Sequence, residues 1–211
     1  MNEEKPPRSL KEKQRRERED LILQATEEVL LEKGFHETTM DEIAARVGIA
    51  KGTLYLHFAH KNDLVLALLE RSLCEVHETV TRIAAQPGSA RERLSQILRV
   101  IFPGLLIKRK RLFYALVHTV DLVQMVKEKH KLLLMQIEQQ IAMLHEEGKA
   151  QGEFDKDLPT DVMTYTFFSV LFSPRLHRIL TVNTQMEPKD FIDYVERIYF
   201  NGIDATENKM K

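Results

Sequence analysis

Cysteine is almost absent from this chain, since Cys74 is the single one among 211 residues. One thiol has no partner for an internal disulfide, which excludes a cross-linked secreted scaffold and fits a reducing compartment. Long apolar runs are lacking as well, and a membrane-spanning helix needs ~20 such residues. The first 20 residues, MNEEKPPRSLKEKQRRERED, are charged where an export signal is apolar. These absences predict a cytoplasmic protein with no membrane association.

A charge imbalance is also lacking. The formal net charge is −1, and residues 1–61 hold 11 Lys and Arg against 12 Asp and Glu. Bulk charge therefore does not indicate nucleic-acid binding. The distribution is more informative, because residues 1–18 carry seven Lys or Arg against four Glu. We expect this basic end of a first helix to lie near a phosphate backbone; a solvated charged tail is the alternative.

Residues suited to catalysis do not form a recognisable set. The eight histidines are scattered, and the lone cysteine has no evident base. His118 and Asp121 have the i, i+3 spacing of a helical pair, but one such pair is weak support for a metal or acid–base site. We therefore predict no catalytic residues, no metal site and no cofactor.

What is present is a helical pattern. Apolar residues recur with the period of helices, without the alternation of strands and without an internal repeat. Longer helices are expected over 9–33, 63–85, 90–106, 109–117, 119–150, 160–180 and 188–203. Breaks are expected at Gly34, at Pro87 and Gly88, near Pro103 and Gly104, at the KRKR run 108–111, at QGEFDKDLP and at TQMEP. The predicted fold class is all-α, with about nine helices.

Two short helices are expected within 38–61, TTMDEIAARVGIAKGTLYLHFAHK. Thr39 and Glu42 have the spacing of a capping box, which places the first helix start at Met40. Its inward face is formed by Ile43, Ala44 and Val47. Gly48 then allows the positive φ of a sharp turn. This pattern is typical of a helix-turn-helix.

The second short helix, 51–58, turns Leu54 and Phe58 inward and leaves its other face to a partner. That face offers a cation, hydroxyls, an imidazole and bare backbone, groups that bind phosphates and base edges in a major groove. Asn62 is expected to cap the next helix, and Lys61 is either a phosphate contact or a plain surface lysine. The predicted DNA-binding residues are Thr39, Lys51, Gly52, Thr53, Tyr55, His57 and Lys61.

The run GFHETTMDEIAARVGIAKGTLYLHFAHKNDL, residues 34–64, is similar to the DNA-binding region of the TetR family of bacterial transcriptional regulators. Turn, recognition helix and the aromatic LYxHF end agree in spacing; Ala50 departs from the serine that is frequent before the recognition helix. The resemblance implies a DNA-binding domain over 1–62 and a helical ligand-binding and dimerisation domain over 63–211. The boundary falls on the helix expected at 63–85, without a flexible linker.

The second half is rich in bulky apolar residues. A packed core is the default interpretation, and the alternative, which the resemblance favours, is a cavity for an apolar or amphipathic small molecule with a few polar groups. The candidate ligand-binding residues are Phe102, Phe113, Tyr114, Val117, His118, Met125, Phe168 and Phe172.

The last two helices carry apolar stripes suited to a two-fold interface. A monomer that buries the last stripe internally is the rival view, and the resemblance favours a homodimer. The candidate interface residues are Val162, Tyr165, Thr166, Ser169, Phe191, Val195, Ile198 and Tyr199.

The sequence thus predicts a ligand-responsive homodimeric regulator that binds a double-stranded DNA operator, most simply a repressor. An enzyme and a helical protein-binding adaptor are the rivals, and the adaptor leaves the outward face with Lys51, Gly52 and Tyr55 unexplained.

Overall fold

A computed structural model describes residues 10–106, 128, 130–171 and 187–204. The helices among them are α1 (Leu10–Glu37), α2 (Met40–Val47), α3 (Lys51–His57), α4 (Lys61–Ala84), α5 (Ala90–Leu106), α8 (Lys131–Ala150), α9 (Thr160–Leu171) and α11 (Pro188–Ile203). Within these ranges the only extended pairing is an isolated bridge between Phe154 and Asp204. The all-α prediction is confirmed, while the helix expected at 109–117 lies outside the described residues.

The first helix is interrupted at Gly34, where its sequence predicts the end. Ile22 and Val29 are fully buried on one face of α1. Gly34 interrupts the helical geometry with φ 81° and ψ 172°, and one further turn reaches Glu37. A residue without Cβ adopts this positive φ at little cost. The Thr38 hydroxyl then donates to the Gly34 carbonyl at 2.7 Å, which fixes the approach to α2.

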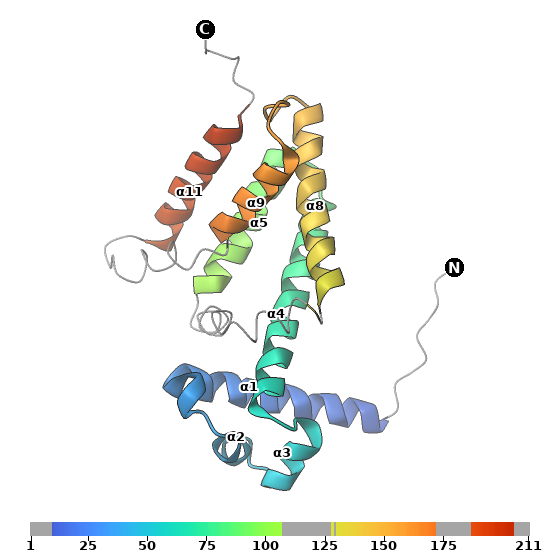
Figure 1. Cartoon of the computed structure of the whole chain (residues 1–211), viewed down its shortest axis with the longest axis vertical. Coiled ribbons are helices and arrows are strands. Elements are labelled where there is room, and N and C mark those ends of the chain that lie inside the picture. The colour runs from blue at the N-terminus through green and yellow to red at the C-terminus, as the bar shows by residue number, and fades with distance from the viewer. Residues whose placement is uncertain (1–9, 107–127, 129, 172–186, 205–211) are drawn as a thin grey trace.

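The long helix α4 joins two hydrophobic cores. It rises from α1, which lies across the foot of the molecule, into an upright bundle of α5, α8, α9 and α11 (Figure 1). Residues 64–69 of α4 are packed into a lower core with α1, α2 and α3, while Leu73, Val76, Val80 and Ile83 belong to the bundle core. The buried Glu27 of α1 also forms an ion pair with Arg71 of α4, with 3.1 Å between a carboxylate oxygen and a guanidinium nitrogen. The predicted domain division after residue 62 stays a prediction.

The bundle core is aromatic where α5 meets α11. Phe102 is 1% exposed and stacks on Phe191 with ring centroids 5.4 Å apart.

The expected break in the helix near Pro103 and Gly104 is wrong, because α5 continues to Leu106. The helix therefore tolerates Pro103, which has no backbone N–H to donate, near its C-terminal end.

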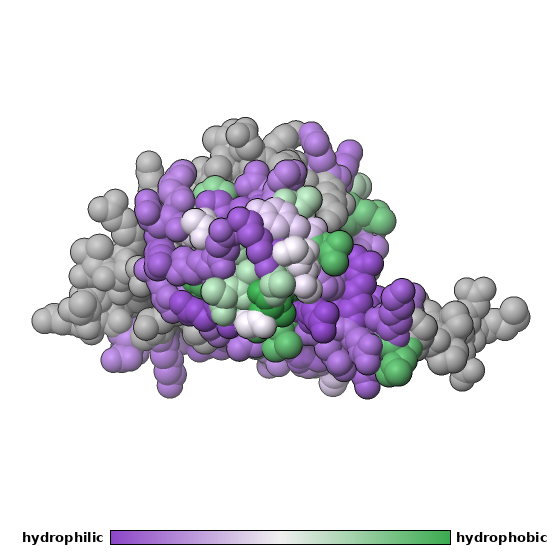
Figure 2. Space-filling model, turned by 90° about the horizontal axis from the view of Figure 1, so that it is seen from below, coloured by the Kyte–Doolittle hydropathy of each residue, from purple (hydrophilic) through white to green (hydrophobic). Residues whose placement is uncertain are grey.

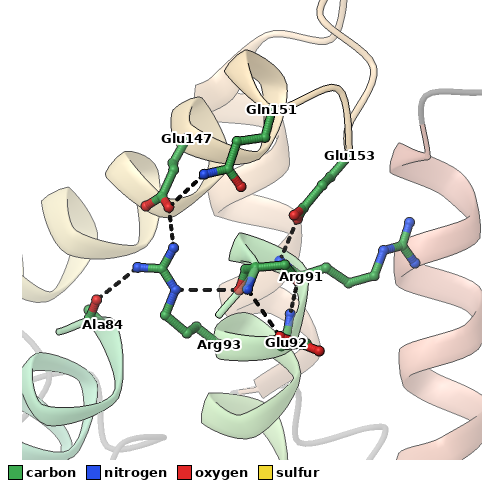
Figure 3. A network of polar contacts seen from close by, with 8 residues as sticks. Ala84, Arg91, Glu92, Arg93, Glu147, Gln151 and Glu153 are labelled. Carbon is green, nitrogen blue, oxygen red and sulfur yellow. Dashed lines mark hydrogen bonds and ion pairs between the residues drawn. The ribbon is translucent and has the colours of Figure 1, made fainter. Parts of the chain in front are cut away.

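Arg93 ties α4, α5 and α8 together at the top of the bundle (Figure 3). Its guanidinium donates to the Ala84 carbonyl at 2.9 Å and to the Ser89 carbonyl at 3.3 Å. It also forms an ion pair with Glu147, which accepts a further bond from Gln151 at 3.0 Å. The planar fork of arginine suits this shared role. The C-terminal end of α4 is thereby held against two neighbouring helices.

A buried histidine links the last three described helices. His145 of α8 has no exposed surface and lies 3.1 Å from the Thr164 hydroxyl and 2.7 Å from the Tyr199 hydroxyl. Tyr199 donates to the Met163 carbonyl at 3.0 Å, so its oxygen must accept from Nε2–H of His145. Nδ1 then accepts from Thr164, and the neutral ring satisfies every partner. Burial lowers the pKa of His145 to about 4.

No helix among the described ranges combines the length and apolar character that crossing a bilayer would need.

Folding stability should fall as pH drops from about 6.5 toward 4, because in that window the unfolded chain binds a proton at His145 that the folded chain does not. A depression of this size corresponds to a loss of about 3 kcal/mol. Urea unfolding of the wild type and of His145→Gln at several pH values checks this. The variant should lack that part of the slope, and equal slopes would contradict the assignment.

Candidate nucleic-acid interface

The first short helix is capped as expected. The Thr39 hydroxyl accepts from the Glu42 N–H at 3.3 Å, and α2 begins at Met40. The reciprocal half of the expected capping box is replaced, because the Glu42 carboxylate lies 2.6 Å from Lys33 Nζ of α1. Thr39 thus has a structural role at the start of α2.

The turn to α3 is tight and is built on Gly48. This residue has φ 76° and ψ 31°, and its N–H donates to the Ala44 carbonyl at 3.0 Å. Ala50 supplies no side-chain cap, but its carbonyl accepts from the Thr53 N–H at 2.9 Å. Leu54 has no exposed surface. Burial of such a side chain contributes about 1.5–3 kcal/mol and anchors α3 from behind.

The opposite face of α3 is open to solvent. Lys51, Gly52 and Tyr55 are exposed, and Thr53 is half-buried. Leu56, which was not among the predicted DNA-binding residues, is 82% exposed. Seen from the end of the molecule where α2 and α3 lie, the surface is mainly hydrophilic with small apolar islands (Figure 2). The predicted outward direction of Lys51 and Tyr55 is confirmed.

Lys51 does not stand alone on this surface. Its Nζ lies 2.6 and 2.9 Å from the two carboxylate oxygens of Asp41 on α2, and 6.0 Å from the centroid of the Tyr55 ring. The hydrogen bond that Lys51 donates to the Asp41 carboxylate raises the pKa of Lys51. This pair was not predicted from the sequence, although Asp41 lies in the first turn of α2 and Lys51 opens α3.

The prediction that His57 lies on the outward face of α3 is wrong. Its side chain is 11% exposed, and Nδ1 lies 3.1 Å from a Glu19 carboxylate oxygen of α1. Hydrogen bonds from His57 and Arg15 lower the pKa of Glu19 against the opposing effect of its partial burial. His57 therefore joins the end of α3 to α1 and is not part of the outward face.

Lys61 is a second correction. Its ammonium donates to the Phe35 carbonyl at 2.6 Å and to the Thr38 carbonyl at 2.9 Å, and it lies 4.3 Å from the centroid of the Phe35 ring. These carbonyls belong to the end of α1 and the connection to α2. Neither a phosphate contact nor a plain surface lysine describes it, because Lys61 fastens α4 to the α1–α2 connection. His60, not Asn62, is the cap, and its N–H donates to Asp63 at 2.8 Å.

The basic start of α1 leaves cations exposed. Lys11, Arg16 and Arg18 are exposed, and among the described residues no ion pair engages them. Lys13 and Arg15 pair with Glu17 and Glu19 one turn away. The expectation that this end approaches a phosphate backbone stays a prediction.

The ligand-binding prediction is only partly covered by the structure. Phe113, Tyr114, Val117, His118, Met125 and Phe172 lie outside the described residues. Phe102 is part of the bundle core, and Phe168 packs half-buried against it. A groove of about 460 Å³ between α5 and α11 is lined mostly by charged side chains, among them Arg99 and Asp193, and by neither of these phenylalanines.

The interface prediction stays a prediction for one face and is wrong for another. Val162, Tyr165 and Ile198 are 56–76% exposed, and Thr166 and Ser169 are exposed beside them on α9. Three predicted residues are instead buried in the protomer's own core, as the rival view had it: Phe191, Val195 and Tyr199. Tyr194, 54% exposed on α11, joins the outward face in their place.

The fold and this site define a helix-turn-helix protein with a helical bundle attached through α4. Residues 22–68 match the family model described as bacterial regulatory proteins, tetR family. This match identifies the segment that contains α2 and α3 as a TetR-family DNA-binding region.

Curated relatives match over the first part of the chain. The fatty acid metabolism regulator protein of Bacillus subtilis is 30% identical over 86 residues, which are 41% of this chain and 44% of that protein. The transcriptional activator FasR of Mycolicibacterium smegmatis is 36% identical over 88 residues, which are 42% of this chain and 40% of that protein. The matches thus span less than half of the length of these two relatives.

Solved structures are similar over most of the chain. A TetR/AcrR-family regulator from Thermobifida fusca has a TM-score of 0.74 at 25% identity, covering 88% of this chain and 98% of that one. Bacillus subtilis FadR in complex with stearoyl-CoA has a TM-score of 0.72 at 20% identity, covering 87% and 98%. The second likeness concerns the fold alone.

Replacement of Lys61 by Met should loosen the link between α4 and the α1–α2 connection. The variant keeps the length of the side chain but leaves the Phe35 and Thr38 carbonyls without their donor, which should lower the free energy of unfolding by about 1–2 kcal/mol. Urea unfolding measures the loss, and hydrogen exchange should show faster opening of α2. Lys33→Met, which removes a partly exposed ion pair, is the control at about 0–1 kcal/mol. Equal behaviour of the two variants would contradict the role of Lys61.

Proposed function

We propose that the protein is a DNA-binding transcriptional regulator that acts as a homodimer in the cytoplasm. A repressor is the form we favour, released from a pseudo-palindromic operator when a small apolar or amphipathic effector binds. The observation that carries the proposal is the outward face of α3, where Lys51, Gly52 and Tyr55 are exposed while the buried Leu54 holds the helix from behind.

The chemistry of this face suits a major groove. An ammonium group binds phosphate oxygens or guanine acceptors, a phenol hydroxyl donates and accepts, and a glycine allows close approach of the backbone. Leu56 adds an exposed apolar side chain that can contact a thymine methyl group. Thr53, the next residue of α3 after Gly52, is half-buried. Thr39 sits at the start of α2, from which a backbone contact to phosphate is reachable.

The homodimer is supported by an exposed apolar face on two helices. Val162 and Tyr165 of α9 and Tyr194 and Ile198 of α11 are all more than half exposed in the single chain. Pairing of this face with its copy would bury them in an isologous interface. Two heads related by the resulting two-fold axis would meet half-sites spaced by ~34 Å or a multiple of it.

The effector is proposed to bind in the bundle and to act through α4. It shifts DNA affinity only if it binds two conformations of the protein unequally. Relatives named for fatty acid metabolism and a neighbour solved with stearoyl-CoA make acyl chains and their thioesters the first class to test. The remaining ligand-binding candidates, Phe113, Tyr114, Val117, His118, Met125 and Phe172, keep their place in this proposal.

Removal of the Tyr55 side chain should weaken operator binding by about 1–3 kcal/mol while leaving helicity unchanged, because the ring is exposed in the free protein. A gel shift on fragments that the wild type enriches from genomic DNA measures the loss. Met143→Ala, a substitution at an exposed position of α8, is the control and should bind the operator as the wild type does.

The affinity of the wild-type protein for the operator should also fall steeply with added salt, because phosphate contacts release counterions. Wild-type protein that enriches no fragment would refute the proposed function.

A charge at Ile198 should separate the protomers. Ile198→Glu places a carboxylate at the centre of the proposed interface, where burial of an unpaired charge is costly, so sedimentation should give the mass of one chain. Val100→Glu, on an exposed position of α5, should leave the mass of the wild type unchanged. An Ile198→Glu protein of wild-type mass would show that the copies pair elsewhere or not at all.

A further inference from the structure

The ion pair between Lys51 and Asp41 lies on the surface that the proposed function turns toward DNA. Both oxygens of the carboxylate approach Nζ, at 2.6 and 2.9 Å, and both side chains are more than half exposed. Asp41 is on α2 and Lys51 on α3, so the pair spans the two helices of the motif. A carboxylate on a DNA-binding face repels phosphates, and its presence there needs a reason.

The other cations of the lower core are engaged in holding helices together. Lys33 pairs with Glu42, and Arg46 pairs with Glu32. Lys61 is occupied by backbone carbonyls. Lys51 is the single Lys or Arg of α3, and it too has a partner. Little positive charge is therefore available on α2 and α3 for non-specific contacts to DNA phosphates.

An ammonium group has three donors, and a carboxylate that accepts from it fixes the direction of those that remain. A free lysine adjusts its rotamers and reaches a phosphate in any register along a duplex. A lysine held at both carboxylate oxygens reaches a partner only where the duplex presents an acceptor in that fixed direction. Contacts of Lys51 to non-operator DNA are then weakened more than its contact in the one fitting register. The protein would thus discriminate between sequences by weakening the wrong contacts.

We propose that Asp41 is a specificity-determining residue that orients the Lys51 ammonium and withholds it from phosphates of non-operator DNA. This inference rests on the proposed function, because it needs Lys51 to face a duplex. Asp41 stays paired on the operator, where Lys51 donates in its fixed direction. On other sequences Lys51 must leave Asp41 before it reaches a phosphate.

The test compares Asp41→Asn with Glu32→Gln. Each variant raises the net charge of the same region by one, but Glu32 pairs with Arg46 and its loss leaves Lys51 held. Asp41→Asn should bind a random-sequence duplex about three- to fivefold more tightly, while its affinity for the sequence that wild type enriches from a random pool does not rise in proportion. The plot of log affinity against log salt for random duplex should steepen by about 0.9, as for one added phosphate contact.

Glu32→Gln should change both affinities by the same factor and keep the wild-type salt slope. The double variant Asp41→Asn with Lys51→Met should lose the gain on random duplex, because that gain is assigned to the released ammonium. Equal specificity ratios in Asp41→Asn and Glu32→Gln would overturn the inference and leave net charge as the whole effect. A wild type that enriches no sequence would instead refute the proposed function, on which the inference depends.

Discussion

Leu64, Leu68 and Leu69 of α4 are buried against the lower core, and further along the same helix Val80 and Ile83 are buried in the bundle. A 24-residue helix is ~36 Å long, so it joins the two cores without a linker. Its ends are also held, because Lys61 donates to carbonyls beside α1 and Arg93 donates to the Ala84 carbonyl. The position of α2 and α3 relative to the bundle therefore depends on how α4 is packed.

Cations of the lower core illustrate how one type of residue serves structure and recognition. Lys61 donates hydrogen bonds to the backbone carbonyls of Phe35 and Thr38. Arg46 joins α2 to α1 through its ion pair with Glu32. Only Lys51 both belongs to α3 and faces solvent, and Asp41 restrains it. With a nearly neutral sequence, we expect discrimination between duplexes to come from the geometry of a few groups more than from the total charge.

Local features of the sequence predicted the motif well. Thr39 and Gly48 act within about one turn of their hydrogen-bond partners, so capping and turn rules apply to them directly. His57 and Lys61 were misjudged because their partners, Glu19 and Phe35, lie 38 and 26 residues away. On α11 the apolar stripe was wide enough for two faces. The spacing of apolar residues along α11 alone did not predict that Tyr199 is buried in the core while Ile198 is exposed.

The core contact of Tyr199 has a consequence for the proposed dimer. Its hydroxyl joins α11 to His145 of α8 and to the Met163 carbonyl of α9, and Phe191 stacks on Phe102 of α5. The outer faces of α9 and α11 are thus fixed relative to each other within one chain before any second copy binds. We expect such a face to pair as a rigid unit, so that a rearrangement of the bundle alters the separation of the two heads through α4 and not through the interface.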